Sequence, residues 1–335
     1  MKFLIAGYGS IGRRHLRNIQ ELGEHELVLL RSKKSTLSEE EIAGLPVETT
    51  VEAALAHRPD AVVIANPTAL HLDVAIPAAR AGVHILMEKP VSGTLERMDE
   101  LENALKTGGA KLLVGFQFRF HPSLALARQF LADQVIGRPL SVRVEWGEYL
   151  PAWHPWEDYR RSYSARADLG GGVALTLSHP FDYLRWLFGE PSDLWAISEQ
   201  ISDLDLDVDD VAEVGLRFES GVIASVHLDY YRRQPVHRFE IVGTRGLMSW
   251  DNADGSVKVV DVENGVNDVF YPPEGFERNW LFVSEMRHFM DVVQGRSEPV
   301  CTLEDGLRAQ QIALALHRAS AERRMLSAAE MFTRS

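Results

Sequence analysis

The chain has 335 residues, 45% of them hydrophobic and 25% charged, which is enough for two domains with a sizeable core. Its formal net charge of -13 argues against free nucleic acid as a partner, and its single cysteine, Cys301, excludes an internal disulfide framework and multi-cysteine metal sites. No apolar run approaches the roughly 20 residues of a membrane span, and no signal peptide is expected because the chain opens directly in an apolar run. These features predict a protein of the reducing cytoplasm without a membrane partner.

The first dozen residues predict a dinucleotide site. An apolar run over residues 2–6 leads into a glycine-rich turn and then a helical stretch over residues 13–22, which is the order of a dinucleotide-binding unit. Gly7 permits the tight turn, Gly9 lets a pyrophosphate approach the backbone, and Gly12 lets the helix pack closely on the strand. Free N–H groups at the helix start would face the phosphates. The expected cofactor contacts are Gly7, Gly9, Ser10, Ile11 and Gly12.

The end of the second predicted strand, residues 26–30, indicates which nicotinamide cofactor binds. An acid at this place would hold the ribose 2′-hydroxyl of NAD, but the chain continues Arg31-Ser32-Lys33-Lys34 and has no acid before Glu39. Arg31 can stack on adenine and pair with a 2′-phosphate. We therefore predict a preference for NADP, with NAD possible, and contacts from Arg31, Ser32 and Lys33. The alternative is an ordinary solvated basic loop.

Three further buried strands are predicted over residues 60–65, 84–87 and 111–115, with helices over residues 51–57 and 72–81 between them. In doubly wound parallel sheets, ligands bind at the carboxyl ends of the strands. The residues that follow these strands are therefore further candidates for cofactor binding: Asn66, Pro67, Thr68, His71, Glu88 and Lys89.

The second half changes its pattern. Alternating apolar and polar residues predict strands over residues 141–146, 210–218, 221–230, 237–242, 247–250 and 257–262, separated by turns typical of hairpins. This is the pattern of a largely antiparallel sheet. Helices are expected over residues 124–133, 173–188, 279–293 and 303–323. An open sheet face needs covering, which favours oligomerisation.

Several motifs together resemble the Gfo/Idh/MocA oxidoreductase family. They are the N-terminal GxGxxG, Glu88-Lys89-Pro90, Phe116-x-x-Arg119-Phe120-x-Pro122, Gly170-Gly171-Gly172 and His179. The resemblance implies an α/β protein with a Rossmann domain over residues 1–120 and a substrate-binding and oligomerisation domain over residues 121–335. The second domain would have a large open, mostly antiparallel sheet that forms homodimers or homotetramers. The helix over residues 303–323 would pack back on the first domain.

The loop over residues 149–161 is dense in aromatic and hydrogen-bonding side chains. Aromatic faces with nearby donors suit a sugar ring, which has apolar C–H faces and a rim of hydroxyls. An interface loop between subunits is the alternative. The expected substrate contacts here are Trp153, His154, Trp156, Tyr159 and Arg160.

The predicted helix over residues 173–188 carries the candidate acid/base. Spacing places Thr176, His179 and Tyr183 on one face. In the family that the chain resembles, an acid and a histidine here assist proton transfer; His179 matches the histidine, but the acid position falls on Thr176, which cannot titrate. We predict His179 as the proton-transferring group, with a structural histidine as the alternative.

Other polar residues have expected supporting roles. Lys89 would donate a hydrogen bond to the substrate oxygen or hold the nicotinamide ribose. Asp182 would orient His179 or a neighbouring residue, and Arg119 would reach a substrate hydroxyl or carboxylate. Glu285 and His288 have the i, i+3 spacing of metal ligands, but nothing near them in the sequence completes a set, so no metal is predicted.

The sequence thus predicts an NADP(H)-preferring oxidoreductase that moves a hydride between nicotinamide and a secondary alcohol or ketone carbon of a sugar, polyol or sugar derivative. Two alternatives stay open. Thr176 in place of an acid is compatible with a non-catalytic NAD(P)-binding regulator, and the family also includes imine or enone reductases of the biliverdin-reductase type.

Overall fold

A computed structural model of the chain describes residues 1–32 and 40–333. Lys33, an expected cofactor contact, lies outside the described residues. The contacts divide the chain into two units, each taken by itself below. Unit 1 comprises Met1–Gln117, Asp168–Gly170 and Glu277–Leu307, and unit 2 comprises Phe118–Ala167, Gly171–Phe276 and Arg308–Ser335.

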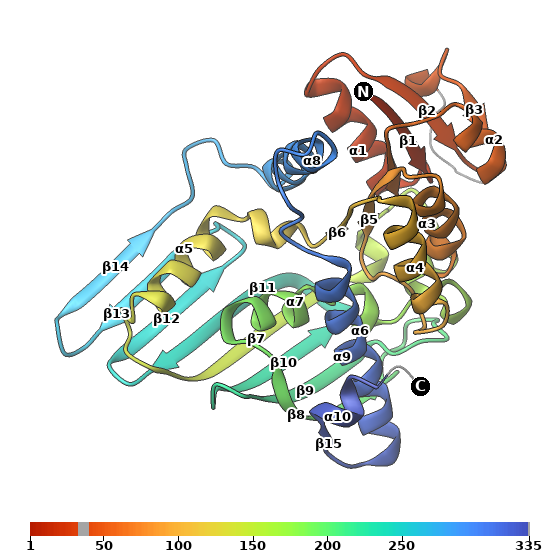
Figure 1. The fold of residues 1–335 in the computed structure, drawn as a ribbon. Coiled ribbons are helices and arrows are strands. Elements are labelled where there is room, and N and C mark those ends of the chain that lie inside the picture. The colour runs from red at the N-terminus through yellow and green to blue at the C-terminus, as the bar shows by residue number, and fades with distance from the viewer. Residues whose placement is uncertain (33–39, 334–335) are drawn as a thin grey trace. The chain divides into compact units, whose positions relative to one another are not determined.

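Unit 1 contains a six-stranded parallel sheet (Figure 1). Its strand order β3-β2-β1-β4-β5-β6 reverses direction between β1 and β4, which is the switch point at which doubly wound sheets bind ligands. The predicted parallel sheet is confirmed. The strands are β1 (Lys2–Ala6), β2 (Glu26–Leu30), β3 (Val47–Glu48), β4 (Ala61–Ile64), β5 (His84–Glu88) and β6 (Leu112–Gly115).

The central strands of this sheet are apolar on both faces because helices cover them. Ile5 of β1, for example, is fully buried and lies in register with Leu29 and Val63 of the flanking strands. The helix over residues 279–293 matches its prediction, whereas α4 was not predicted. The helices of this unit are α1 (Ser10–Glu21), α2 (Val51–Ala56), α3 (His71–Arg80), α4 (Met98–Gly108) and α8 (Asn279–Val293).

Unit 2 contains a nine-stranded sheet in the order β14-β13-β12-β11-β7-β10-β9-β8-β15 (Figure 1). Only the β7–β10 pair is parallel, so the expected mostly antiparallel sheet is confirmed. Strands β8, β14 and β15 were not predicted. The bounds are β7 (Pro139–Tyr149), β8 (Pro191–Glu199), β9 (Val211–Phe218), β10 (Ile223–Asp229), β11 (Tyr231–Gly243), β12 (Gly246–Asp251), β13 (Val257–Asp261), β14 (Val266–Phe270) and β15 (Leu326–Ser327).

The expected single helix over residues 173–188 is wrong. The chain forms α6 (Val173–Thr176), leaves the helical conformation at Leu177 with ψ at 38°, and restarts as α7 (His179–Phe188). Pro180 explains the break, because proline lacks the backbone N–H that a helix interior needs but fits the first turn of a new helix. Thr176 and His179 therefore do not share the face of one continuous helix.

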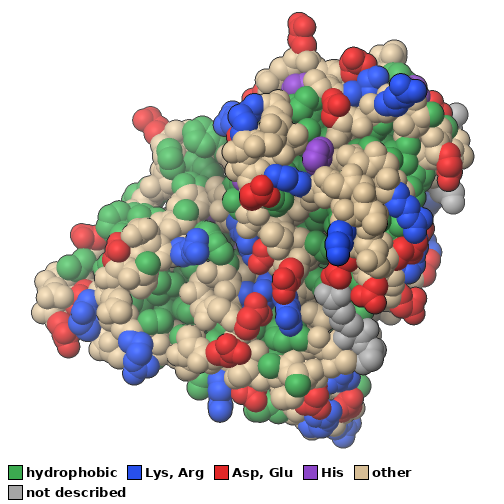
Figure 2. Space-filling view, viewed as in Figure 1, with side chains coloured by type: hydrophobic (Ala, Val, Ile, Leu, Met, Phe, Trp, Pro, Cys, Tyr) green, Lys and Arg blue, Asp and Glu red, His purple; other side chains and the backbone are tan. Residues whose placement is uncertain are grey.

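The remaining helices of unit 2 are α5 (Pro122–Ala132) and α10 (Ala328–Met331), and α9 (Leu303–Glu322) has its first residues in unit 1 and the rest in unit 2. Among the described residues, no helix is both long and apolar enough to cross a membrane. On the face shown in Figure 2, basic and acidic side chains are interspersed and do not form one large basic patch.

Candidate functional site

The glycine turn after β1 has a different physical reason for each glycine. Gly7 adopts φ +99°, and a Cβ there would lie 2.6 Å from the backbone nitrogen of Asn66. A Cβ on Gly12 would lie 2.1 Å from the carbonyl oxygen of Gly7, so this close approach of α1 to the turn requires glycine. A Cβ on Gly9 would meet nothing within 4 Å. The open space over Gly9 at the start of α1 fits a pyrophosphate on the helix N-terminus.

Arg31 follows β2 directly, and its side chain is held close to this turn. Arg31 is only 6% exposed, and its guanidinium lies 5.5 Å from the centre of the Tyr8 ring. Its backbone N–H donates to the carbonyl of Glu48 at 3.0 Å. Ser32, by contrast, is exposed. A buried arginine stacked on an aromatic ring is a defined feature of the fold and differs from a solvated loop.

Two more arginines near the turn are bound to one carboxylate. Glu41 accepts hydrogen bonds from Arg13 and Arg17 of α1, which hold its pKa down at about 2. Burial, and secondly Glu41, raises the pKa of Tyr8. Glu41 therefore neutralises part of the positive charge of α1.

The turn after β4 is held by its own hydrogen bonds. The buried His71 side chain bonds through Nε2 to the carbonyl oxygen of Asn66 at 3.0 Å, and the Asn66 amide donates to the carbonyl of Leu70 at 3.2 Å. Burial lowers the pKa of His71. Thr68 is buried as well, and a Cβ on Gly170 would lie 3.1 Å from it. His71 thus serves the shape of this turn, and the backbone of Gly170 lies close against Thr68.

At the end of β5, adjacent residues differ in their surroundings. The carboxylate of Glu88, an expected cofactor contact, bonds through Oε1 to Nε2 of His15 at 2.8 Å inside unit 1. Lys89, the next residue, is half-buried. Glu88 is therefore already hydrogen-bonded to His15 of α1.

In unit 2, His179 lies in a cluster of aromatic rings at the start of α7. It is 3% exposed, and its ring meets Phe118 edge-on at 4.9 Å and Trp146 at 5.6 Å. Trp146 in turn stacks on His237, with ring centres 4.1 Å apart and planes 5° from parallel. Thr176 is buried too. Packed rings of this kind hold the imidazole of His179 in one orientation.

Arg119 and Asp182 form a buried ion pair in the same unit. Asp182 accepts three hydrogen bonds from the Arg119 guanidinium, and the side chains are 1% and 6% exposed. Asp182 was expected to orient His179 or a neighbouring residue, and Arg119 is the residue to which it is bonded. A guanidinium held in this way has fewer donors left for a substrate.

The aromatic loop places its predicted contacts in different surroundings. Trp153 packs edge-on against buried Tyr230 at 5.7 Å, whereas Trp156 is 65% exposed. Tyr159 accepts the backbone N–H of Asp205 at 3.0 Å. Arg160 is exposed and bound to Asp158 and Asp205, and the ion pair with Asp158 raises its pKa. His154 lies 5.3 Å from the Trp156 ring.

Two features were missed in the sequence. His237, which the sequence analysis does not single out, occupies an inward position of β11 in line with buried Phe239 and Ile241; its place in the alternation was the available signal. Glu285 was considered only together with His288, but it is fully buried near His15 and Glu88. No local pattern connects these three residues, which come from distant parts of the chain.

Comparison with known proteins agrees with this arrangement. Residues 1–116 match the oxidoreductase family with an NAD-binding Rossmann fold, and residues 124–249 match the GFO/IDH/MocA C-terminal domain. A 1,5-anhydro-D-fructose reductase from Ensifer adhaerens is 30% identical over 292 residues, which cover 86% of this chain and 82% of the relative. The chain belongs to the Gfo/Idh/MocA oxidoreductase family.

Other family members match nearly the whole chain. A myo-inositol 2-dehydrogenase from Thermotoga maritima is 27% identical and covers 99% of both chains. A solved levoglucosan dehydrogenase in complex with NADH superposes with a TM-score of 0.87 at 22% identity, covering 98% of both chains. The protein is an NAD(P)-dependent oxidoreductase of this family, as its motifs imply.

Proposed function

We propose that the protein is an NADP(H)-preferring oxidoreductase that transfers a hydride between nicotinamide and a secondary alcohol or ketone carbon of a sugar, polyol or sugar derivative. The observation that carries the cofactor preference is Arg31. It directly follows β2, at the place where an acid would select NAD, and is buried against Tyr8. A planar guanidinium in this position pairs with a 2′-phosphate and stacks on adenine. The exposed hydroxyl of Ser32 is a second donor.

The glycine turn supplies the rest of the cofactor contacts in this proposal. Gly9, Ser10 and Ile11 present the start of α1 to the pyrophosphate, and Asn66, Pro67 and Thr68 at the end of β4 line the adjoining strand end. When bound, NAD(P)(H) supplies or accepts the hydride. The protein's own side chains bind and orient the substrate and the cofactor, and they move the proton.

Two residues carry the proton chemistry in the proposal. Lys89 donates a hydrogen bond to the substrate oxygen and stabilises charge that develops on it. His179 accepts or returns the hydroxyl proton, a role that suits a group with an ordinary pKa near neutrality. The ring contacts of His179 with Phe118 and Trp146 orient it for this transfer.

The substrate class follows from the relatives and from the loop over residues 149–161. The relatives are named for anhydrofructose, inositol and levoglucosan, which are all sugar or polyol compounds. Trp153, Trp156 and Tyr159 offer aromatic faces to C–H groups. Arg119, His154, Arg160, Thr176 and Asp182 are the proposed polar groups around the hydroxyls.

The first experiment is a paired titration of the purified protein with NADPH and NADH, followed by nicotinamide fluorescence. We expect tighter NADPH binding, and we expect R31A to lose most of the difference between the two cofactors. R80A, which removes an exposed arginine of α3, is the matched control and should keep the difference. Equal or tighter NADH binding by the unmodified protein would contradict the NADP preference.

Turnover is tested next on a panel of sugars, polyols and their keto derivatives. K89M and H179Q are each expected to lower kcat by about 10²–10⁴-fold, with cofactor affinity measured separately in each variant. Cofactor binding without turnover of any panel member would favour the regulator, and turnover confined to imines or enones would favour the biliverdin-reductase type.

We also propose that the protein is a homodimer or homotetramer formed through the unit 2 sheet. The sheet exposes Trp195 and Ile197 of β8 and Ile223 of β10 at 44%, 54% and 55%. Trp195 and Ile223 line a shallow groove with Leu194, Leu216 and Met325. An exposed apolar area of this kind is commonly covered in an oligomer. The cytoplasmic location stays a prediction.

A further inference from the structure

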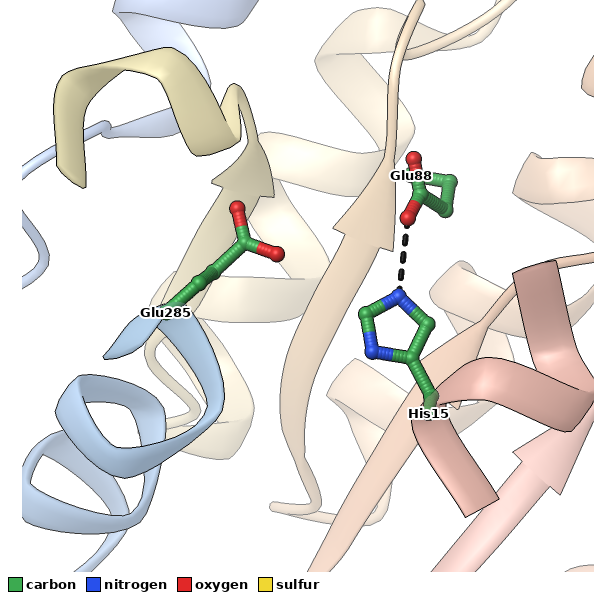
Figure 3. Close-up of side chains that lie close together, drawn as sticks. All are labelled: His15, Glu88 and Glu285. Carbon is green, nitrogen blue, oxygen red and sulfur yellow. Dashed lines mark hydrogen bonds and ion pairs between the residues drawn. The ribbon is translucent and has the colours of Figure 1, made fainter. Parts of the chain in front are cut away.

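Three ionisable side chains from distant parts of the chain meet inside unit 1. His15 lies on α1, Glu88 ends β5 and Glu285 lies on α8, and their nearest potential ligand atoms are within 4.8 Å of one another (Figure 3). The exposed fractions are 0% for His15, 9% for Glu88 and 0% for Glu285. In Figure 3 the Glu285 carboxylate points from α8 toward the side on which His15 and Glu88 lie.

Neither carboxylate oxygen of Glu285 has a hydrogen-bond partner among the described residues, and the same is true of Nδ1 of His15. A buried carboxylate without a donor is costly. In the acidic form, the O–H of Glu285 has ligand-type atoms of His15 and Glu88 within 4.8 Å as acceptors, but the second oxygen still lacks a donor among the described residues. Glu285 therefore lacks a hydrogen-bond donor among the described residues.

Packing explains why Glu285 is held here. Asn279 and Asn18 join α8 to α1 through an amide hydrogen bond of 2.9 Å, and Arg14 lies 4.5 Å from the ring centre of Phe282. Arg14 thus packs on an aromatic face, and no hydrogen bond joins it to Glu285 among the described residues. The two helices set Glu285 beside His15.

The hydrogen bond between His15 and Glu88 also resembles the carboxylate–histidine pairs found at metal centres. If Nε2 of His15 carries the proton and donates to Glu88 at 2.8 Å, the lone pair of Nδ1 is available. A carboxylate that fixes the tautomer of a histidine is the usual outer partner of a metal-bound imidazole. In a second geometry, Nε2 of His15 and the carboxylate of Glu88 would both bind the ion directly. The ligand-type atoms lie within 4.8 Å of one another, and binding would draw them to about 2.0–2.2 Å from the ion.

We propose that His15, Glu88 and Glu285 bind a divalent transition-metal ion, with Glu285 as a direct ligand. One imidazole with one or two carboxylates forms a mixed N/O set that suits Zn²⁺ or Mn²⁺ better than Mg²⁺ or Ca²⁺, which prefer oxygen ligands alone. The ion would join α1, β5 and α8, and its main consequence would be stability of unit 1.

The test uses the full chain without an affinity tag, treated with EDTA and then freed of it. Zn²⁺ and Mn²⁺ are titrated separately by calorimetry, and thermal unfolding is measured with and without each ion. We expect one ion per chain and a higher Tm in its presence. E285Q should weaken binding at least about tenfold and lose the Tm increase.

H288Q is the matched control. His288 lies one helical turn from Glu285 but accepts the backbone N–H of Val300 at 3.2 Å, so H288Q should bind the metal as the unmodified protein does. If E285Q does not fold, H15Q replaces it with the same expectation. Absence of binding, equal binding by E285Q or H15Q and the unmodified protein, or a crystal structure from Zn²⁺-containing solution with only water beside Glu285 would each overturn the proposal.

Discussion

The guanidinium of Arg119 and the carboxylate of Asp182 form a doubly buried ion pair, joined by hydrogen bonds of 2.7, 3.0 and 3.2 Å. Breaking a buried ion pair by removal of one partner typically costs about 3–5 kcal/mol, because the other charge stays buried without its counter-charge in the pair. We therefore expect D182A to lower the free energy of unfolding by about this amount in urea titrations.

The matched control for D182A is D291N, which breaks the exposed pair between Asp291 and Arg296. Exposed pairs contribute about 0–1 kcal/mol, so D291N should unfold near the midpoint of the unmodified protein. Similar losses of stability in D182A and D291N would contradict the assigned importance of burial.

Gly9 and Gly12 are predicted to respond differently to the same change. G12A places a Cβ 2.1 Å from the Gly7 carbonyl oxygen and should lower Tm strongly, because backbone must move. Gly9 has φ -86° and open space around its Cβ position, so G9A should keep Tm close to that of the unmodified protein. Its methyl group would instead occupy the path of the pyrophosphate and weaken NADPH binding.

Thermal unfolding and NADPH titration of both variants measure this contrast. Unchanged NADPH affinity in a well-folded G9A would show that the phosphates do not approach Gly9, and the proposed cofactor position would fall with it.

His121 predicts a pH dependence of stability. It is 1% exposed, its Nδ1 accepts the Ser123 N–H at the start of α5, and burial lowers its pKa from 6.5 to about 4. As the pH falls through 6.5, the unfolded chain binds a proton at this residue that the folded chain does not bind, so the free energy of unfolding decreases. By about pH 4.5, this protonation lowers the free energy of unfolding by about 2–3 kcal/mol.

H121N retains a side-chain acceptor at the helix start and removes the titrating group. Urea unfolding near neutral pH and near pH 4.5 should show a smaller acid-induced loss in H121N than in the unmodified protein. An equal loss in both proteins would assign the acid sensitivity to other residues.

Oligomerisation through the unit 2 sheet is tested by charge insertion. W195E and I223E place a carboxylate in the exposed apolar area of β8 and β10, and each should shift the mass measured by light scattering toward the monomer. L70E alters a residue of unit 1 with the same 44% exposure as Trp195 and should leave the mass unchanged. Persistence of the oligomer in both sheet variants would place the interface elsewhere.

Local patterns were sufficient for much of the fold. The glycine turn, the continuous apolar runs and the helix over residues 279–293 were each predicted from neighbouring residues, because turns, strands and amphipathic helices have short periods. The break before His179 was also encoded locally in Pro180 and was overlooked. Strand β8 was missed because it begins at Pro191, directly after the end of α7, and proline is typical of a helix end.

The sequence by itself determined the chemistry available to this protein: a phosphate-binding turn, a basic residue after the second strand, a lysine at a strand end and a histidine at a helix start. Only the tertiary structure decided which of these groups are already committed to partners. Arg119 is bound to Asp182, Glu88 bonds His15, and Glu285 lies beside Glu88 and His15 although it belongs to α8, far along the chain. Such pairings depend on packing between distant elements, and burial then decides their energies because it removes the water that would otherwise solvate each charge.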